Sequence, residues 1–254
     1  LRLALAYAIN YKHMGPSALA SATPHSPSLI HPYTSGVDQY INYEVIEESF
    51  ETEDWDGVPV IKYDPELAIK ILSEHCNGSV EEGWTYNGTK LGGWTILAVS
   101  GWGDCMTQAE MAANYWKEIG IDAEPVFLSY SVWESRVKNF DYDWYCGFNS
   151  ITPGSAAAVR QLTNLLTVSS KAGYSVWTTP VTFPDFFPEE YEQIKPLIDE
   201  MWHLPYGSEE SIKLAKKIQE IYVPLLIFIP CFASSNWWRW TTTEWVNFHT
   251  KTHP

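Results

Sequence analysis

Two pairs of residues have the types and spacing that could do chemistry. Asp141 and Asp143 flank Tyr142, so in an extended chain both carboxylates point to the same side. A pair of carboxyl groups is what the hydrolysis of a glycosidic bond requires. His249 and His253 have the i,i+4 spacing with which two histidines on one helix face can bind a metal ion.

The surroundings of both pairs weaken these interpretations. The chain contains 31 Asp and Glu residues, so two nearby acids arise without a functional cause, and the two histidines lie in a tail of Thr, Lys and Pro. The GxSxG elbow, the P-loop, the GxGxxG pattern and the HExxH motif are all missing from the sequence. We therefore expect no catalytic residues, no metal site and no cofactor.

Charge and aromatic content narrow the choice of partners. The formal net charge of −15 argues against nucleic acid and anionic membranes, because both attract Lys and Arg. The 13 Trp residues are an unusually large number. Trp is enriched at recognition surfaces, although a Trp-rich core could hold part of this set. No apolar run approaches the ~20 residues of a spanning helix, and the first residue is Leu1 rather than Met, so we expect a mature or trimmed product.

The four cysteines, Cys76, Cys105, Cys146 and Cys231, show neither CxxC nor zinc-ribbon spacing. Cys146 and Cys231 lie in apolar runs, which favours buried free thiols. An exported protein could instead pair its cysteines, and four cysteines allow three connectivities.

Two tripeptides, Asn77-Gly-Ser and Asn87-Gly-Thr, fit the pattern for N-glycosylation. Asn-Gly pairs are also typical of tight turns, because both residues tolerate positive φ angles. We favour the turn interpretation for both.

The stretch 95–149 predicts alternating strands and helices. Thr95–Ser100 is a short apolar run with branched residues, which favours a buried strand. After a Gly-rich break, Thr107 and Glu110 have the spacing of a capping box, which predicts the start of a helix. Gly120 stands where the end of that helix needs a positive φ angle.

The second half of the stretch repeats this pattern. Ile121–Leu128 predicts a strand, and Pro125 indicates that it lies at an edge. Ser131 and Glu134 form a second capping-box pattern, and Asp143–Phe148 predicts the third strand. Two strand–helix–strand crossovers in one block imply an α/β fold, with a mostly parallel sheet flanked by helices.

The predicted sheet suggests where a ligand would bind. Ligands of open parallel sheets lie beyond the carboxyl ends of the strands, which selects Ser100 and Trp102 after the first strand and Asn149 after the third. Glycines on both sides of Trp102 leave room beside a flat ring. Trp133 is a further candidate that is equally suited to the core, and the aromatic loop around Trp177 is the alternative position for the site.

Outside this stretch the pattern is less regular. Leu1–Met14 is Ala-rich and predicts one helix, and residues 15–36 form a polar connection without a period. Asp64 precedes a Pro and predicts a capped helix start. The continuous apolar run Val223–Phe232 predicts a strand.

Several segments, taken together and in order from residue 1 to about 232, resemble the family 5 extracellular solute-binding proteins of ABC importers. This group contains dipeptide-, oligopeptide- and cello-oligosaccharide-binding proteins. The resemblance implies a lobe of the type II periplasmic-binding-protein fold, with residues 1–232 as the C-terminal lobe and residues 233–254 as a return segment toward a first lobe. The matching segments are Arg2–Asn10, Tyr63–Leu72, Ala109–Ile121, Trp133 with Arg136–Val137, Asn139–Asp143 and Tyr222–Ile227.

The resemblance also bears on the ligand. Peptide-binding members usually carry an aspartate after the strand that matches 143–148, where it holds the peptide ammonium, whereas residues 149–154 here contain no acid. The segment Ser100-Gly-Trp-Gly103 resembles the oligosaccharide-binding branch. A sugar ring can stack its C–H face on indole while Asn149 pairs with hydroxyl groups.

The implied function is that of a receptor that closes two lobes on a cello-oligosaccharide-like ligand and delivers it to the membrane permease of an ABC transporter. The implied location is extracellular or periplasmic, with the full-length protein tethered to the membrane as a lipoprotein. Two alternatives stay open: a peptide receptor of the same family, and a glycoside hydrolase that uses Asp141 or Asp143.

Overall fold

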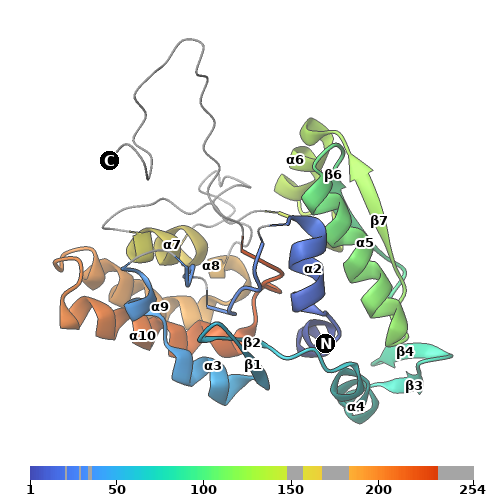
Figure 1. Ribbon diagram of the computed structural model, residues 1–254, viewed down its shortest axis with the longest axis horizontal. Helices are drawn as coiled ribbons and strands as arrows, with labels where there is room; N and C mark the ends of the chain where they lie inside the picture. The colour runs from blue at the N-terminus through green and yellow to red at the C-terminus, as the bar shows by residue number, and fades with distance from the viewer. Residues whose placement is uncertain (21, 29, 34–35, 148–156, 168–182, 234–254) are drawn as a thin grey trace.

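The computed structural model describes residues 1–20, 22–28, 30–33, 36–147, 157–167 and 183–233 (Figure 1). Four residues singled out from the sequence, Asn149, Trp177, His249 and His253, lie outside these described residues. Helices α9 and α10 lie on one side of the molecule and the sheet with α5 on the other, with α2 between them (Figure 1). In the described part of the chain, no helix combines the length and the apolar character that crossing a membrane requires.

The middle part of the chain forms a three-stranded parallel sheet with the strand order β7-β6-β8. The prediction of a parallel α/β fold is therefore confirmed. Pro125 lies in β7, an edge strand, as predicted, because there its missing N–H costs no ladder bond. The third strand is shorter than predicted and pairs over two residues only. The elements of this unit are β6 (Trp94–Val99), α5 (Gly103–Glu118), β7 (Ala123–Leu128), α6 (Tyr130–Lys138) and β8 (Trp144–Tyr145).

The two helices of this unit cover opposite faces of the sheet. Successive side chains of a strand point to alternate faces. Ile96 and Ala98 belong to the large core that includes the apolar side of α5, whereas Leu97 and Val99 pack with Trp133 of α6. Because β7 and β8 flank β6 on opposite sides, the second crossover must pass back over β6, which brings α6 to the free face.

The predicted N-terminal helix consists of two helices, α1 (Arg2–Tyr7) and α2 (Tyr11–Ala18). The break has a local cause, because the side chain of Asn10 accepts a hydrogen bond from the backbone N–H of His13 and caps a new helix. Each helix buries several of its residues against the rest of the chain, and α2 packs on α5.

Further short elements surround the sheet. Asp64 caps α4 by accepting the N–H of Leu67 at 2.9 Å, as its position before a Pro predicts. Asn87 has a φ of 48° in the turn of an antiparallel meander, so the turn interpretation of Asn87-Gly is confirmed, whereas that of Asn77-Gly is wrong because both residues lie in β3. The elements are β1 (Thr52–Trp55), β2 (Val58–Ile61), α4 (Pro65–His75), β3 (Asn77–Ser79), β4 (Gly83–Tyr86) and β5 (Thr89–Leu91).

The C-terminal part is helical where the structure describes it. The Val223–Phe232 strand prediction is wrong, because α10 runs to Tyr222 and continues into a 3-10 turn that ends at Leu226 in the left-handed region, with φ 43°. Inside the core, Gln219 holds α10 in place by donating to the carbonyl of Tyr40. The elements are η1 (Asp38–Tyr40), α3 (Tyr43–Ser49), α7 (Ala157–Leu166), α8 (Phe183–Phe186), α9 (Pro188–Met201), α10 (Glu209–Tyr222) and η3 (Val223–Leu225).

Candidate functional site

The carboxyl edge of the sheet turns directly from β6 into α5. The N–H of Ser100 donates to the carbonyl of Leu128 at 2.7 Å, which extends the β6–β7 ladder by one residue. Gly101 has a φ of +88°, a conformation that L side chains rarely adopt, and it turns the chain so that Trp102 is the N-cap of α5. The exposed side chain of Ser100 and the partly exposed ring of Trp102 therefore lie together at this edge, as predicted.

Trp102 packs against two rings of α6. Its ring centroid lies 5.8 Å from that of Tyr130, with 31° between the planes, and 6.2 Å from that of Trp133. Tyr130 is also partly exposed, whereas Trp133 is 1% exposed. The edge thus presents two neighbouring, half-buried rings that rest on a buried third ring.

Tyr130 is a residue of this edge that sequence reasoning missed. Its hydroxyl donates to Glu134 at 3.0 Å, and the same carboxylate oxygen accepts from Lys138 at 2.9 Å. The bond from Lys138 and then that from Tyr130 hold the pKa of Glu134 below its usual value. The signal was available, because Tyr130 follows the carboxyl end of β7 just as Trp102 follows that of β6.

Trp133 belongs to the core rather than to the surface. It packs with Leu97, Val99 and Val137 under the sheet, and its ring meets that of Tyr145 at 5.9 Å. Its indole Nε1 is buried and has no hydrogen-bond partner. The structure thus brings together Ser100, Trp102 and Trp133, while Asn149 and Trp177 remain predictions that no described residue tests.

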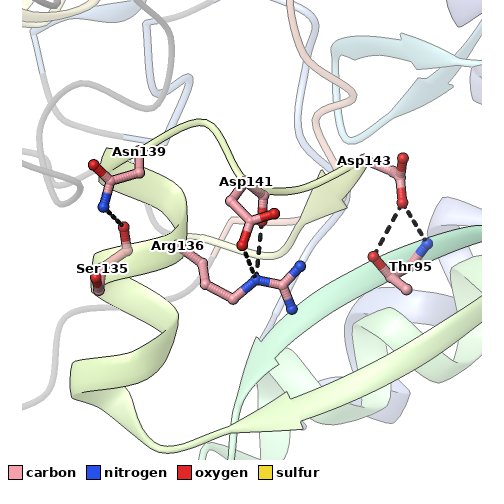
Figure 2. Close-up of polar contacts among 6 residues, drawn as sticks. All are labelled: Thr95, Ser135, Arg136, Asn139, Asp141 and Asp143. Atoms are coloured by element: carbon pink, nitrogen blue, oxygen red, sulfur yellow. Dashed lines mark hydrogen bonds and ion pairs between the residues drawn. The ribbon is translucent and has the colours of Figure 1, made fainter.

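The two aspartates of the hydrolase alternative lie at the other end of the sheet, between α6 and β8. Figure 2 shows that each has its own partner: Asp141 accepts from Nε of Arg136 at 2.9 Å, whereas Asp143 accepts from the N–H of Thr95 at 2.9 Å and from its hydroxyl at 3.1 Å. Thr95 stands at the start of β6, so both carboxylates are remote from Trp102 along the strand. They connect the loop before β8 to its neighbours.

Three of the four cysteines, Cys105, Cys146 and Cys231, lie near one another. Cys146 is buried directly after β8, and its N–H donates to the carbonyl of Leu97 at 2.8 Å. Burial raises the pKa of the Cys105 thiol to about 12, that of Cys231 to about 11, and that of Cys146 well above its usual value. All four cysteines are free, and the expectation of a buried free thiol is confirmed for Cys146, whereas Cys231 is free but only partly buried. Among the described residues, no cluster of His, Cys, Asp or Glu could hold a metal ion.

Comparison with known proteins identifies the family. Residues 1–171 match the model of the bacterial extracellular solute-binding proteins, family 5, middle region. The chain belongs to this family. Members of the family are periplasmic or extracellular receptors of ABC importers, not enzymes. None of the curated proteins matches the chain in sequence.

Solved structures support the same assignment. A periplasmic oligopeptide-binding protein of an oligopeptide ABC transporter from Thermotoga maritima is 26% identical, with a TM-score of 0.76 over 100% of this chain and 44% of its own. The same protein with bound mannohexaose gives a TM-score of 0.74 at 26% identity and the same coverage. NikA from Brucella suis, in complex with Fe(III)-EDTA, shares the fold at 16% identity and a TM-score of 0.65, over 92% of this chain and 41% of its own. The chain thus spans less than half the length of these proteins.

Proposed function

We propose that residues 1–232 form the second lobe of a two-lobed receptor, and that residues 233–254 lead back to the first lobe. The receptor captures an oligosaccharide of the cello-oligosaccharide type in the cleft between its lobes and delivers it to the permease subunits of an ABC importer. It works outside the cytoplasm, and the full-length protein is tethered to the membrane. Membership of the family supports the receptor role, and the 44% coverage of the Thermotoga maritima protein supports the assignment of a single lobe.

The observation that carries the choice of ligand is the pair of half-buried rings at the carboxyl edge, Trp102 and Tyr130. A pyranose ring presents an apolar C–H face that stacks on an aromatic ring, and its hydroxyl groups need neutral polar partners. Ser100, exposed beside Trp102, provides one hydroxyl, and Asn149, which the sequence pattern selects and which lies outside the described residues, provides an amide in this proposal. The mannohexaose complex of the Thermotoga maritima protein supports the same ligand class.

A peptide ligand is the second candidate, because the name of the Thermotoga maritima protein describes an oligopeptide receptor. The positive ammonium of a peptide needs a counter-charge in a desolvated cleft. Residues 149–154 supply no acid, and the two acids that precede them most closely in the sequence, Asp141 and Asp143, are engaged at the opposite end of the sheet. We therefore prefer the neutral oligosaccharide.

The test is a titration of the two-lobed receptor with cellohexaose, mannohexaose and a short peptide, followed by calorimetry. We expect heat of binding with at least one hexasaccharide and none with the peptide. Chromatography of the sugar after incubation should recover it intact. Binding of the peptide alone would overturn the choice of ligand, and the appearance of shorter sugars would overturn the receptor function itself.

A further inference from the structure

The indole Nε1 of Trp133 is a buried hydrogen-bond donor that has no acceptor among the described residues. The side chain is 1% exposed, so water does not reach the N–H group. Buried polar groups in folded proteins are nearly always paired, because an unpaired donor loses its bond to water and gains nothing in return. An unpaired group therefore needs an explanation at the place where it occurs.

The position of this donor points to the ligand edge. A Cβ atom placed on Gly147 would lie 3.9 Å from Cζ2 of Trp133. Cζ2 and Nε1 are bonded to the same ring carbon, so the edge of the indole that carries the N–H group lies beside the end of β8. The described side chains of the same cluster include Leu97, Val99 and Val137, which have no acceptor, and three tyrosines, none of whose hydroxyls accepts a hydrogen bond from Nε1.

We propose that the N–H group of Trp133 donates a hydrogen bond to a hydroxyl or ring oxygen of the bound oligosaccharide when the receptor closes. This inference rests on the proposed function. Trp102 and Tyr130 then provide the face on which a sugar ring stacks, and Trp133, directly behind them, provides a directional contact. A donor that is unpaired in the empty lobe and paired in the complex makes binding favour ligands with an oxygen at that point.

The experiment replaces the indole N–H group of Trp133 and keeps the shape of its ring. In the two-lobed receptor, Trp133→benzothienylalanine exchanges the N–H group for sulfur. We expect its affinity for the better of mannohexaose and cellohexaose to fall about tenfold or more. The matched control is Trp55→benzothienylalanine, because Nε1 of Trp55 is also buried without a partner but lies in the β1–β2 hairpin, under Lys12. The control should bind the sugar with unchanged affinity.

The outcomes separate this inference from the proposed function. If the unmodified receptor binds neither hexasaccharide, the proposed function is wrong. If it binds one of them and the Trp133 analogue binds equally well, the function stands and this inference is wrong. Unchanged affinity together with a lower melting temperature would assign the N–H group to a structural contact, such as the face of the Tyr145 ring.

A second measurement covers the case in which the analogue does not fold. In the unmodified receptor with nitrogen-labelled Trp, saturation with the sugar should shift the indole N–H resonance of Trp133 downfield and slow its exchange with solvent. The indole resonance of Trp55 should stay in place. A Trp133 resonance that does not respond to a sugar that binds would overturn the inference.

Discussion

The two ends of the parallel sheet differ in how their polar and aromatic groups are used. At the amino end, Asp143 accepts two hydrogen bonds from Thr95, and Asp141 pairs with Arg136 (Figure 2). At the carboxyl end, Trp102 leaves part of a large ring accessible, and the N–H group of Trp133 has no partner. At the amino end the polar side chains are paired within the chain. At the carboxyl end a ring surface stays accessible and a donor has no described partner.

On this difference we base the structural role that we assign to the amino end and the binding role that we propose for the carboxyl end. A carboxylate that accepts several bonds from its own chain fixes a loop and has little left to offer a substrate. A ligand can still stabilise half-buried rings by covering their exposed surface, and an unpaired donor by accepting its hydrogen bond. The sequence pattern that most resembled a catalytic site, Asp141 with Asp143, lies at the amino end, where the side chains are paired.

The largest expected effect comes from Trp133→Ala, which removes the ring on which the carboxyl end rests. Because the side chain is 1% exposed, we expect the free energy of unfolding to fall by about 3–5 kcal/mol, the usual cost of truncating a buried aromatic residue. Denaturant unfolding of the lobe measures it. A loss below about 1 kcal/mol would mean that Trp133 is not a core residue, which would break the contrast between the buried ring and its exposed neighbours.

The next effect concerns binding rather than stability. Trp102→Ala in the two-lobed receptor should weaken binding of a hexasaccharide by about 1–3 kcal/mol, the usual cost of losing a binding-site aromatic. The melting temperature should change less than in Trp133→Ala, because Trp102 is only partly buried. Calorimetry gives the affinity. If the affinity is unchanged, Trp102 is structural, and the alternative position is the aromatic stretch of the sequence around Trp177.

The sequence predicted the sheet well, because its signals there are strong and local. An apolar run such as 95–100 can be buried only as a strand between covered faces, and Gly120 does adopt the positive φ of +80° that its position at the end of α5 requires. Asp64 caps its helix as predicted. In each case a few adjacent residues determine the structure.

The capping boxes at Thr107 and Ser131 failed for tertiary reasons. Helix α5 begins at Gly103, because the turn at Gly101 leads straight from the strand into the helix. Helix α6 begins at Tyr130, since Glu134 bonds to the hydroxyl of Tyr130 and to Lys138 rather than to the helix start. The sequence pattern shows which partners are possible but not which one the packed structure selects.

The candidate site could be predicted only in part for the same reason. That Trp102 lies at the carboxyl edge follows from strand order and chain direction, which the sequence indicates. That Trp133 is buried and Tyr130 exposed depends on how α6 rotates on the sheet, which is decided by the packing of Leu97 and Val99 beneath it. Helical period alone gives the spacing of such residues and not their distance from a ligand.

A smaller effect on stability should follow from Asp143→Ala at the amino end of the sheet. The substitution removes the acceptor for the N–H and hydroxyl of Thr95, and we expect a loss of about 1 kcal/mol in the free energy of unfolding, since both donors are exposed enough to bond to water instead. Sugar affinity should be unchanged. A selective loss of affinity, with stability intact, would show that the amino end also takes part in binding and would remove the contrast between the two ends.

The smallest effect concerns the brace of Tyr130, by which we mean the hydrogen bonds that Glu134 accepts from Tyr130 and Lys138. It is measured as a dependence of stability on pH. The hydrogen bond from Lys138, and then that from Tyr130, lower the pKa of Glu134 in the folded protein, so the brace contributes stability above the ordinary pKa of a glutamate and loses it as the pH falls through the lowered value. Glu134 is exposed to solvent, so the contribution is small. Glu134→Gln should therefore reduce the acid-side slope of melting temperature against pH and leave the neutral-pH value nearly unchanged.

Tyr130→Phe serves as the matched variant, because it keeps the ring and removes the hydroxyl. If both variants bind the hexasaccharide as the parent does while Tyr130→Ala binds more weakly, the ring is the part of Tyr130 that the ligand uses. If Tyr130→Phe alone loses affinity, the hydroxyl contacts the sugar directly, and the bond to Glu134 must break on binding.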